Sequence, residues 1–230
     1  MKAALISIKG NWAHFRKAET NNNPLTHDFI TKTALVGMIG AVLGKERGEM
    51  RPLFPQLCED LMYCVQINNV VQKQSWGFTL RSASNLYDKS PKPMEVIRNA
   101  DYSVLLALKN ERSYFLFEHF VSLITVEKTH FQPVLGLHNC PADLALVELG
   151  TLSEQQQGEF ETYGFVSTEH QPTLQSLPRL NFDRIPTYQT DDFWNRPDAY
   201  IPVIYPSNQE TLKSKGVFYQ FNNQSQWFLI

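Results

Sequence analysis

The residues of this sequence that could do chemistry are cations that stand among aromatic and hydroxyl side chains. They form three clusters, at 9–17, 29–33 and 68–93. The candidate binding residues in them are Lys9, Asn11, Trp12, His14, Arg16, Lys17, Thr31, Lys32, Lys73, Trp76 and Arg81. Cations neutralise phosphates and aromatic faces stack on bases, so this combination is typical of surfaces that bind single-stranded RNA.

Each cluster can also be explained without RNA binding. The first could be a solvated loop that Trp12 anchors in the core. In the second, Thr31 and Lys32 could hold a phosphate at the start of a helix, but a threonine there could simply cap the helix. The third, where Asp88 is the one acidic residue, could be a hairpin that clamps a nucleic-acid strand or touches a neighbouring subunit. Because all three clusters are positively charged and lie in the first hundred residues, we favour nucleic-acid binding.

Other kinds of site are not indicated. None of the six histidines belongs to an HExxH pattern and the three cysteines form no CxxC pair, so we expect no metal ion and no disulfide framework. The sequence lacks the GxSxG elbow, the GxxxxGK[ST] loop and the GxGxxG fingerprint. We therefore expect no cofactor.

The elements that must position the clusters alternate between strands and helices. Residues 4–8 alternate in hydropathy and predict a strand that ends at Gly10. An irregular loop follows it. The next segment has apolar residues at helical spacing, and it predicts a helix that starts at Thr31 or Thr33 and ends at Gly44.

Two glycines inside this helix, Gly37 and Gly40, suggest a close approach to the sheet beneath it. The other expected elements are a helix at 53–60, strands at 62–67, 102–108 and 144–149, and a helix at 114–126. The 68–93 segment looks like a projecting hairpin inserted in this order. The order of these strands and helices predicts the α+β class, with a ferredoxin-like or RRM-type βαββαβ domain at 1–150.

The remaining residues, 151–230, have a different character. Six prolines lie between Pro172 and Pro206, among short apolar runs with strand propensity. We expect a β-rich, loop-heavy portion that packs on the first domain.

Composition limits the class of protein. The 230 residues carry a net charge of −2, and 43% of them are hydrophobic. No apolar run is long enough for a membrane span or a signal peptide, so we expect no membrane contact and a reducing cytoplasm. The charge is uneven: 13 basic and 8 acidic residues at 1–100 give +5, whereas 8 and 15 at 101–230 give −7. The basic first part fits a polyanionic partner.

Several segments resemble a known family. They are Lys9–Lys17, Asn21–Pro24, Phe29–Gly44, Pro93–Ile97, Pro133–Gly136, Asn139–Ala142 and Arg184–Pro186. Together they resemble the CRISPR-associated RAMP-superfamily subunit that caps the 5′ handle of CRISPR RNA in type I Cascade complexes. The amino-acid sequence of these segments is most similar to that of the type I-B branch.

This resemblance implies a ferredoxin-like domain with a thumb-like hairpin at about 68–93 and a reduced C-terminal portion at 151–230. The subunit would hold the 5′ handle of the guide RNA in antiviral defence, its thumb would pack against the adjacent backbone subunit, and the large subunit would dock nearby. Target DNA would be met through the complex. Carried over by position, the residues that meet the handle are Trp12, His14, Arg16, Lys17, Thr31 and Lys32. Arg81 and its basic neighbours would be thumb contacts.

The resemblance also raises the question of catalysis. Relatives in the type I-C branch cleave precursor RNA with a Tyr, Lys and His set, which supplies the base and the acid for the reaction. Here Lys128 and His130 are two positions apart instead of adjacent, with tyrosines at 63, 87, 102 and 114. We therefore expect a non-catalytic subunit. The alternatives are a metal-independent endoribonuclease for repeat RNA and an RRM-like RNA binder outside CRISPR biology.

Overall fold

The computed structural model of the protein describes residues 1–20, 22–81, 84, 87, 89–172, 179–190, 197–207 and 209–230. Two residues noted above lie outside these ranges. They are Asn21, in one of the segments that carry the resemblance, and Asp88, the acidic residue of the predicted hairpin.

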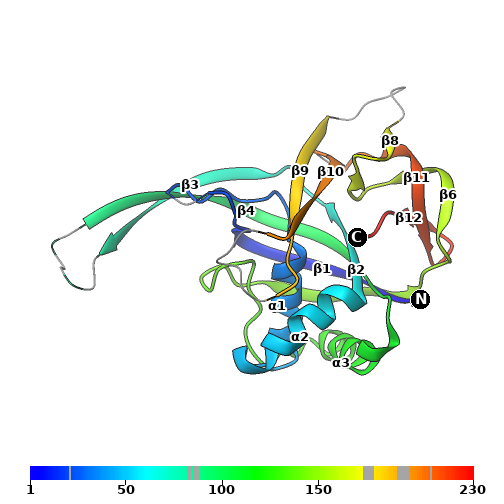
Figure 1. Ribbon diagram of the computed structural model, residues 1–230, viewed down its shortest axis with the longest axis horizontal. Helices are drawn as coiled ribbons and strands as arrows, with labels where there is room; N and C mark the ends of the chain where they lie inside the picture. Colours follow the sequence, from blue (N-terminus) through cyan, green and yellow to red (C-terminus); the bar gives the residue numbers. More distant parts are fainter. Residues whose placement is uncertain are drawn as a thin grey trace.

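A five-stranded antiparallel sheet forms the centre of the protein (Figure 1). Its strands are β1 (Lys2–Ala13), β2 (Leu61–Ile67), β3 (Gln72–Arg81), β4 (Lys89–Leu108) and β5 (Asp143–Thr151). Strands β2, β4, β1 and β5 are neighbours in that order, and β3 pairs with the outer part of β4. β1 lies between β4 and β5, which explains why Ile6 and Ile8 are fully buried.

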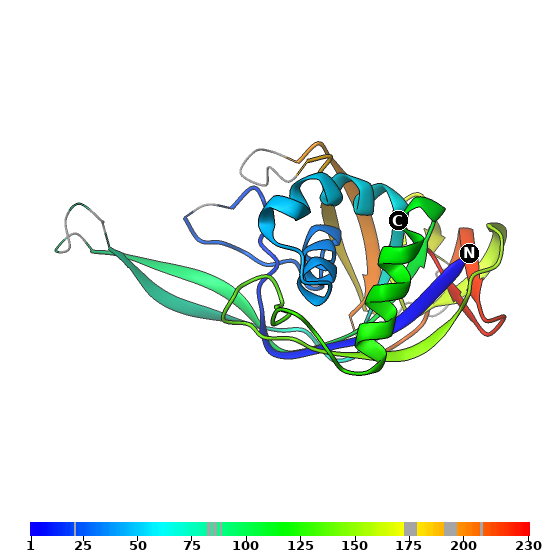
Figure 2. The same ribbon diagram turned by 90° about the horizontal axis from the view of Figure 1, so that it is seen from below.

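Three helices pack against one face of this sheet (Figure 2). They are α1 (Lys32–Val42), α2 (Arg47–Asp60) and α3 (Tyr114–Thr125), the last preceded by the short 3-10 helix η1 (Glu111–Ser113). The order β1, α1, β2, β4, α3, β5 confirms the predicted α+β class and the ferredoxin-like arrangement, to which α2 and β3 are additions.

The prediction that the first strand ends at Gly10 is wrong, because β1 continues to Ala13. Gly10 serves a different purpose. A Cβ atom at this position would lie 2.5 Å from Leu135 Cδ1 and 2.7 Å from the Pro141 carbonyl oxygen. The glycine lets the 131–141 loop pack directly on the strand, and the strand itself remains regular.

The helices depart from the predictions in two places. α2 begins at Arg47 instead of at 53, with a capping box between Glu46 and Glu49, although it contains two prolines. The expected approach of the sheet to the glycines of α1 is also wrong. Gly40 is close to the Met50 side chain of α2, and nothing lies within 4 Å of a Cβ at Gly37.

A hairpin formed by β3 and β4 projects from the body of the protein (Figure 1). This confirms the predicted hairpin at 68–93. Its second strand is not a separate insertion, because β4 runs without a break for 20 residues from the hairpin into the centre of the sheet. The root of the hairpin is therefore continuous with the central sheet.

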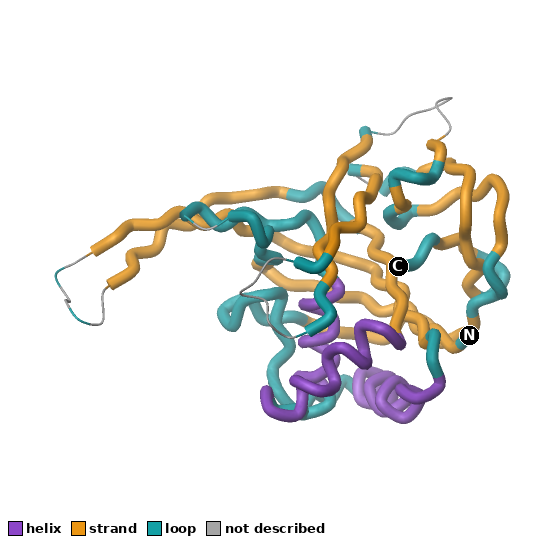
Figure 3. Tube along the Cα trace, viewed as in Figure 1, coloured by secondary structure: helices purple, strands orange, loops and turns teal. Residues whose placement is uncertain are grey.

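The C-terminal portion consists of short strands (Figure 3). They are β6 (Gln156–Thr162), β7 (Val166–Ser167), β8 (Gln171–Pro172), β9 (Leu180–Thr187), β10 (Ala199–Pro206), β11 (Leu212–Phe221) and β12 (Ser225–Trp227). They form one sheet in the order β7, β10, β9 and another in the order β12, β11, β6, with β8 beside β11. The predicted β-rich character of this portion is confirmed.

The hydrophobic core continues from the central sheet into the C-terminal portion. Phe165 stacks on Phe29 with ring centroids 5.4 Å apart and meets Tyr63 edge-on at 5.7 Å. Aromatic contacts of this kind stabilise a packed interface. Among the residues that the structure describes, no helix has both the length and the apolar character needed to cross a membrane.

Candidate nucleic-acid interface

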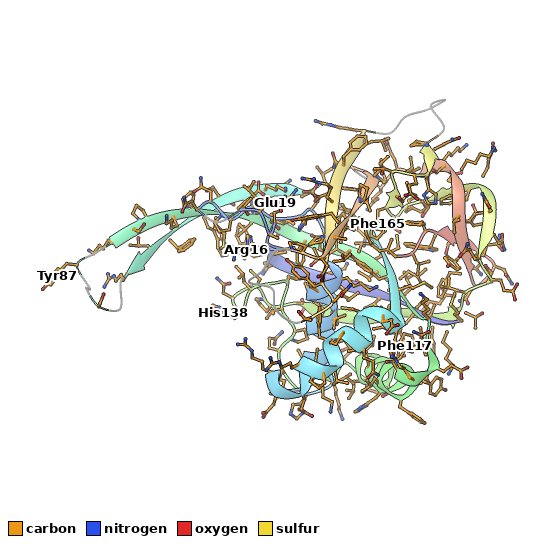
Figure 4. All side chains as sticks on the ribbon, viewed as in Figure 1. Arg16, Glu19, Tyr87, Phe117, His138 and Phe165 are labelled. Atoms are coloured by element: carbon orange, nitrogen blue, oxygen red, sulfur yellow. The ribbon has the colours of Figure 1, made fainter. Side chains whose placement is uncertain are left out.

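The loop between β1 and α1 lies in the corner where the hairpin leaves the body. Figure 4 shows Arg16 and Glu19 of this loop between the hairpin and β9. Two contacts attach the loop to the hairpin root: the Glu95 backbone N–H donates to the Pro24 carbonyl at 2.9 Å, and Glu95 Oε2 accepts from the Thr26 N–H at 3.0 Å. The loop that carries the later part of the first predicted cluster, from His14 to Lys17, is thus held by Glu95, about 70 positions away.

Two predicted residues of this region are buried. His14 is 4% exposed, and its Nδ1 lies 2.7 Å from the Glu95 carbonyl oxygen. Burial lowers the pKa of this imidazole, which favours its neutral form. Thr31, also 4% exposed, shares a hydroxyl hydrogen bond of 2.9 Å with Thr33 and does not cap α1 with its side chain. Neither side chain faces the solvent, so we leave both out of the interface.

Two predicted lysines are paired with carboxylates. Lys17 Nζ lies 3.0 Å from Asp183 Oδ1, and Lys73 Nζ lies 2.8 Å from Asp28 Oδ1 and 3.4 Å from Glu95 Oε2. Burial by itself lowers the pKa of Lys73, but the carboxylates outweigh it and raise the pKa. These ion pairs join the loop to β9 and to the hairpin, so both lysines have a structural role.

The Asp183 carboxylate is the centre of the first of these networks. Its side chain is 6% exposed, and its second oxygen lies 2.9 Å from His27 Nδ1. Burial alone raises the pKa of this carboxyl, but His27, Lys17 and the Arg184 backbone N–H together outweigh it and hold the pKa at about 2. Asp183 is therefore ionised at neutral pH and ties β9 to the loop.

The predicted aromatic residues meet at the root of the hairpin. Trp12 and Trp76 form an edge-to-face pair with ring centroids 4.8 Å apart. Next to them is a groove of about 410 Å³ between the hairpin and the 131–141 loop. Its lining residues are Ser75, Trp76, Gly77, Phe78, Met94, Leu137, His138 and Asn139. The groove is mostly apolar and aromatic, with Ser75, His138 and Asn139 as its polar lining residues and no Lys or Arg among them.

The remaining predicted residues lie at the surface. Lys9 is exposed and forms a 3.1 Å ion pair with Asp101, while Asn11 is exposed on the same strand. Arg81 is exposed near the far end of the hairpin. Lys32 is half-buried and lines a second, smaller cavity beside β9. The eleven predicted residues therefore do not form a single continuous site.

Sequence reasoning missed an aromatic surface with arginines on β9, β10 and the N-terminal loop. It also contains a carboxylate, since Glu19 Oε2 accepts a hydrogen bond of 3.5 Å from the Tyr200 hydroxyl. The Arg184 guanidinium lies over the Tyr200 ring, 5.4 Å from its centroid, and Phe182 on the same face of the ladder is 67% exposed. Burial raises the pKa of the Tyr188 phenol, and the charge of nearby Arg16 opposes that rise. We call Arg16, Phe182, Arg184, Tyr188 and Tyr200 the arginine–tyrosine surface.

A signal for this surface was present in the sequence. In the segment 180–187, Phe182 and Arg184 alternate with Asp183 and Ile185, which is the period of a strand with one exposed face. We predicted a loop-heavy portion at 151–230 and therefore did not identify this alternation as a strand with an exposed face. The approach of Arg16 to this strand could not have been found, because no local pattern relates residue 16 to residue 188.

The residues considered for catalysis are not assembled. Tyr114 begins α3, at the end of the helix away from Lys128, and its hydroxyl accepts a hydrogen bond of 2.8 Å from Lys2 Nζ. Tyr63 and Tyr102 are almost completely buried, and burial raises the pKa of both phenols. Lys128 and His130 are exposed in the segment after α3, while Tyr87 lies at the far tip of the hairpin (Figure 4). Across the described part of the chain, no three His, Cys, Asp or Glu side chains are grouped as a metal site would require.

Comparisons with solved structures show where this fold occurs. A CRISPR protein from Archaeoglobus fulgidus is 12% identical, with a TM-score of 0.62 and 96% of each chain covered. A chain of a CRISPR RNA-guided surveillance complex is also 12% identical, with a TM-score of 0.54 over 93% of this chain and 91% of that one. A chain of a type III-B Cmr-beta complex bound to cognate target RNA is 8% identical, with a TM-score of 0.51 and coverage of 92% and 86%.

The sequence comparisons are more specific. No protein with a curated description matches this sequence. The profile of the family described as CRISPR-associated protein (Cas_Cas5) matches residues 5–199, which include β1, the hairpin, the helices and β9. The chain belongs to the Cas5 family of CRISPR-associated proteins.

Proposed function

We propose that this protein is a non-catalytic, RNA-binding subunit of a type I CRISPR surveillance complex, of the I-B branch, which acts in the cytoplasm in antiviral defence. It holds the 5′ handle of the guide RNA. The observation that carries this proposal is the arginine–tyrosine surface, in which Arg16 of the N-terminal loop lies near enough to Tyr188 for its charge to act on that phenol, and Arg184 lies over the Tyr200 ring. Membership of the Cas5 family and the fold shared with a chain of an RNA-guided surveillance complex support it.

The chemistry of this surface suits single-stranded RNA. Arg16 and Arg184 can each neutralise a phosphate, and the exposed Phe182 ring offers a face to a base. Tyr200 already carries the Arg184 guanidinium on its ring, which holds that cation in place. A strand of RNA bound to these residues could continue along the loop between β1 and α1 toward the hairpin root.

The hairpin is the proposed contact to other subunits. The groove that Trp76, Phe78 and Met94 help to line can take an apolar side chain of the adjacent backbone subunit, because aromatic side chains and the pockets they form are common anchors of protein interfaces. The large subunit would bind nearby, and target DNA would be reached through the assembled complex.

A non-catalytic role is supported by the positions of the candidate acid and base groups. RNA cleavage without a metal needs a base near the 2′-hydroxyl and an acid near the leaving oxygen. Lys128 and His130 lie in the segment after α3, Tyr63 and Tyr102 are buried, and Tyr87 is at the hairpin tip. The endoribonuclease alternative is kept as an outcome of the test.

The test is RNA binding by the purified protein, followed by fluorescence anisotropy with labelled repeat-derived RNA at two salt concentrations. Arg184→Ala should weaken binding by about tenfold. It should also reduce the slope of log K against log salt by about 0.7, since one phosphate contact is lost. Lys213→Ala removes an exposed cation from β11 and serves as the matched control that should bind like the wild type.

Two results would contradict the proposal. Equal loss of affinity in both variants would mean that binding depends only on net charge. Cleavage of the RNA at one position in the presence of chelator, abolished in Lys128→Ala or His130→Ala, would make the protein a nuclease.

A further inference from the structure

The two arginines of the arginine–tyrosine surface come from distant parts of the chain. Arg16 lies on the loop between β1 and α1, Arg184 lies on β9, and both side chains are exposed. An exposed arginine has many rotamers, and binding a ligand costs free energy when these rotamers must first be ordered. The affinity of this surface for a strand of phosphates therefore depends on how firmly the protein already holds the two guanidinium groups.

The Asp183 carboxylate connects the two parts of the chain that carry these arginines. Its Oδ1 accepts hydrogen bonds from the Arg184 backbone N–H at 2.8 Å and from Lys17 Nζ at 3.0 Å. Its Oδ2 lies 2.9 Å from His27 Nδ1, which must be the donor because an ionised carboxylate can only accept. One carboxylate thus binds the backbone of Arg184 and two side chains of the loop that contains Arg16.

A turn that ends at Thr20 links this attachment to the Arg16 side chain. The Lys17 carbonyl oxygen accepts from the Thr20 N–H at 3.1 Å and from the Thr20 hydroxyl at 2.8 Å, and the same hydroxyl accepts from the Leu25 N–H at 3.0 Å. The Thr20 carbonyl oxygen accepts from Nε and Nη2 of Arg16, at 3.3 and 3.2 Å. Because the guanidinium group is planar and rigid, two contacts to one oxygen restrict its orientation.

Two acidic side chains lie at this surface, and both join the loop to the strands. Glu19, which precedes Thr20, accepts the hydrogen bond of the Tyr200 hydroxyl, while the Tyr200 ring carries the Arg184 guanidinium. A carboxylate repels phosphate, so it is unfavourable in an RNA-binding surface unless it serves the structure. The Asp183 side chain is only 6% exposed and is bonded to donors of the protein, which fits a positioning role.

We propose that Asp183 and Thr20 are positioning residues of the RNA-binding surface. Asp183 holds Lys17 next to the backbone of Arg184, and the turn from Lys17 to Thr20 sets the direction of the Arg16 guanidinium. Neither residue needs to touch the RNA, and both raise the affinity because they order the arginines before binding. This role rests on the proposed function, since it requires that Arg16 and Arg184 bind RNA.

The first test is the affinity of Asp183→Asn and Thr20→Val for labelled repeat-derived RNA, measured by fluorescence anisotropy. Both variants keep the size of the side chain, and we expect each to bind about fivefold more weakly than the wild type. The sign is decisive for Asp183→Asn, because removal of a negative charge would by itself favour a polyanion, whereas loss of positioning weakens binding. Asp143→Asn makes the same charge change at an exposed position of β5 and is the matched control, which should bind the RNA at least as tightly as the wild type.

Double-mutant cycles with Arg16→Ala separate positioning from a general loss of structure. Arg16→Ala should weaken RNA binding about tenfold in the wild type, but less than about twofold in Asp183→Asn or Thr20→Val, because a misdirected guanidinium contributes little. A merely structural role would give losses that multiply. The NMR signal of the Arg16 Nε–H in the free protein is a second readout, which we expect to be resolved in the wild type and broadened by exchange in both variants.

Binding is measured at a temperature where urea denaturation shows each variant to be folded. Thr20→Val leaves the ion pairs of Asp183 in place, so it decides the question if Asp183→Asn does not fold. Unchanged or tighter RNA binding in a folded variant would overturn the role of that residue, and losses that multiply with Arg16→Ala would overturn it for both.

The two proposals fail separately. If Arg184→Ala weakens RNA binding but neither Asp183→Asn nor Thr20→Val does, the proposed function stands and the positioning role falls. If the wild type does not bind RNA, the proposed function falls, and the Arg16 Nε–H signal still decides whether Asp183 and Thr20 order the Arg16 side chain. The same resolved signal in the wild type and both variants would then overturn the positioning role as well.

Discussion

Replacing Asp183 with asparagine should destabilise the protein by about 2.5 kcal/mol at pH 7. The magnitude follows from the carboxyl group, whose pKa falls from 3.8 to about 2 on folding because His27 and Lys17 outweigh the effect of burial. Each pKa unit corresponds to about 1.36 kcal/mol, and the side chain is only 6% exposed, so solvent screens little of this energy. Asparagine keeps the size of the side chain and removes its charge.

The dependence on pH has a definite sign. Because the folded state has the lower pKa, the stabilisation is complete above about pH 5 and is lost as the pH falls through 3.8 toward 2. The difference in unfolding free energy between wild type and Asp183→Asn should therefore be constant from pH 7 to about 5 and shrink between pH 4 and 2. Other carboxylates titrate in the same range, but they are common to both proteins and cancel in the difference.

Urea denaturation at each pH measures this difference, with Asp143→Asn as the control for an exposed carboxylate. The control should stay within about 0.5 kcal/mol of the wild type. A difference for Asp183→Asn below 0.5 kcal/mol at pH 7 would refute the reasoning. So would a difference that stays the same from pH 7 to pH 2, since the loss would then come from packing and not from the charge.

Three further changes test other parts of the structure by the same denaturation measurement. Gly136→Ala should cost about 2 to 4 kcal/mol, because φ is +89° there and the new Cβ would collide with the His14 carbonyl oxygen. Gly37→Ala should instead stabilise by about 0.5 to 1 kcal/mol, since the position is helical, exposed and open, and a loss would contradict the described α1. Lys73→Met should cost about 1 to 2 kcal/mol by leaving Asp28 without its cation, and no change would mean that this ion pair does not hold the hairpin root.

Much of the fold could be predicted because it is encoded in local patterns. The hydropathy of 62–67 and 102–108 identified β2 and the inner part of β4, and the apolar spacing of 114–126 identified α3. The errors have local causes too. Gly10 was taken for a strand end because glycine often breaks strands, whereas here it makes room for Leu135 and Pro141.

The candidate site was predictable only in part. Lys32 was identified from its place at the start of a helix, and the structure puts it, half-buried, in the wall of a small cavity beside β9. Lys17 and Lys73 stood in equally basic segments, but the structure pairs both with carboxylates. A cation pattern shows where charge is present, and it does not show whether an acidic residue far along the chain already neutralises that charge.

The sequence by itself determined the order of strands and helices in residues 1–150, the projecting hairpin and membership of the Cas5 family. These depend on side-chain periodicity and on short motifs, which are properties of neighbouring residues. Only the tertiary structure decided which cations remain available for a ligand. Asp183 lies 166 positions from Lys17 and Arg16 meets Tyr188 across a similar distance in the chain, so these partners come together only when the core of the protein has formed.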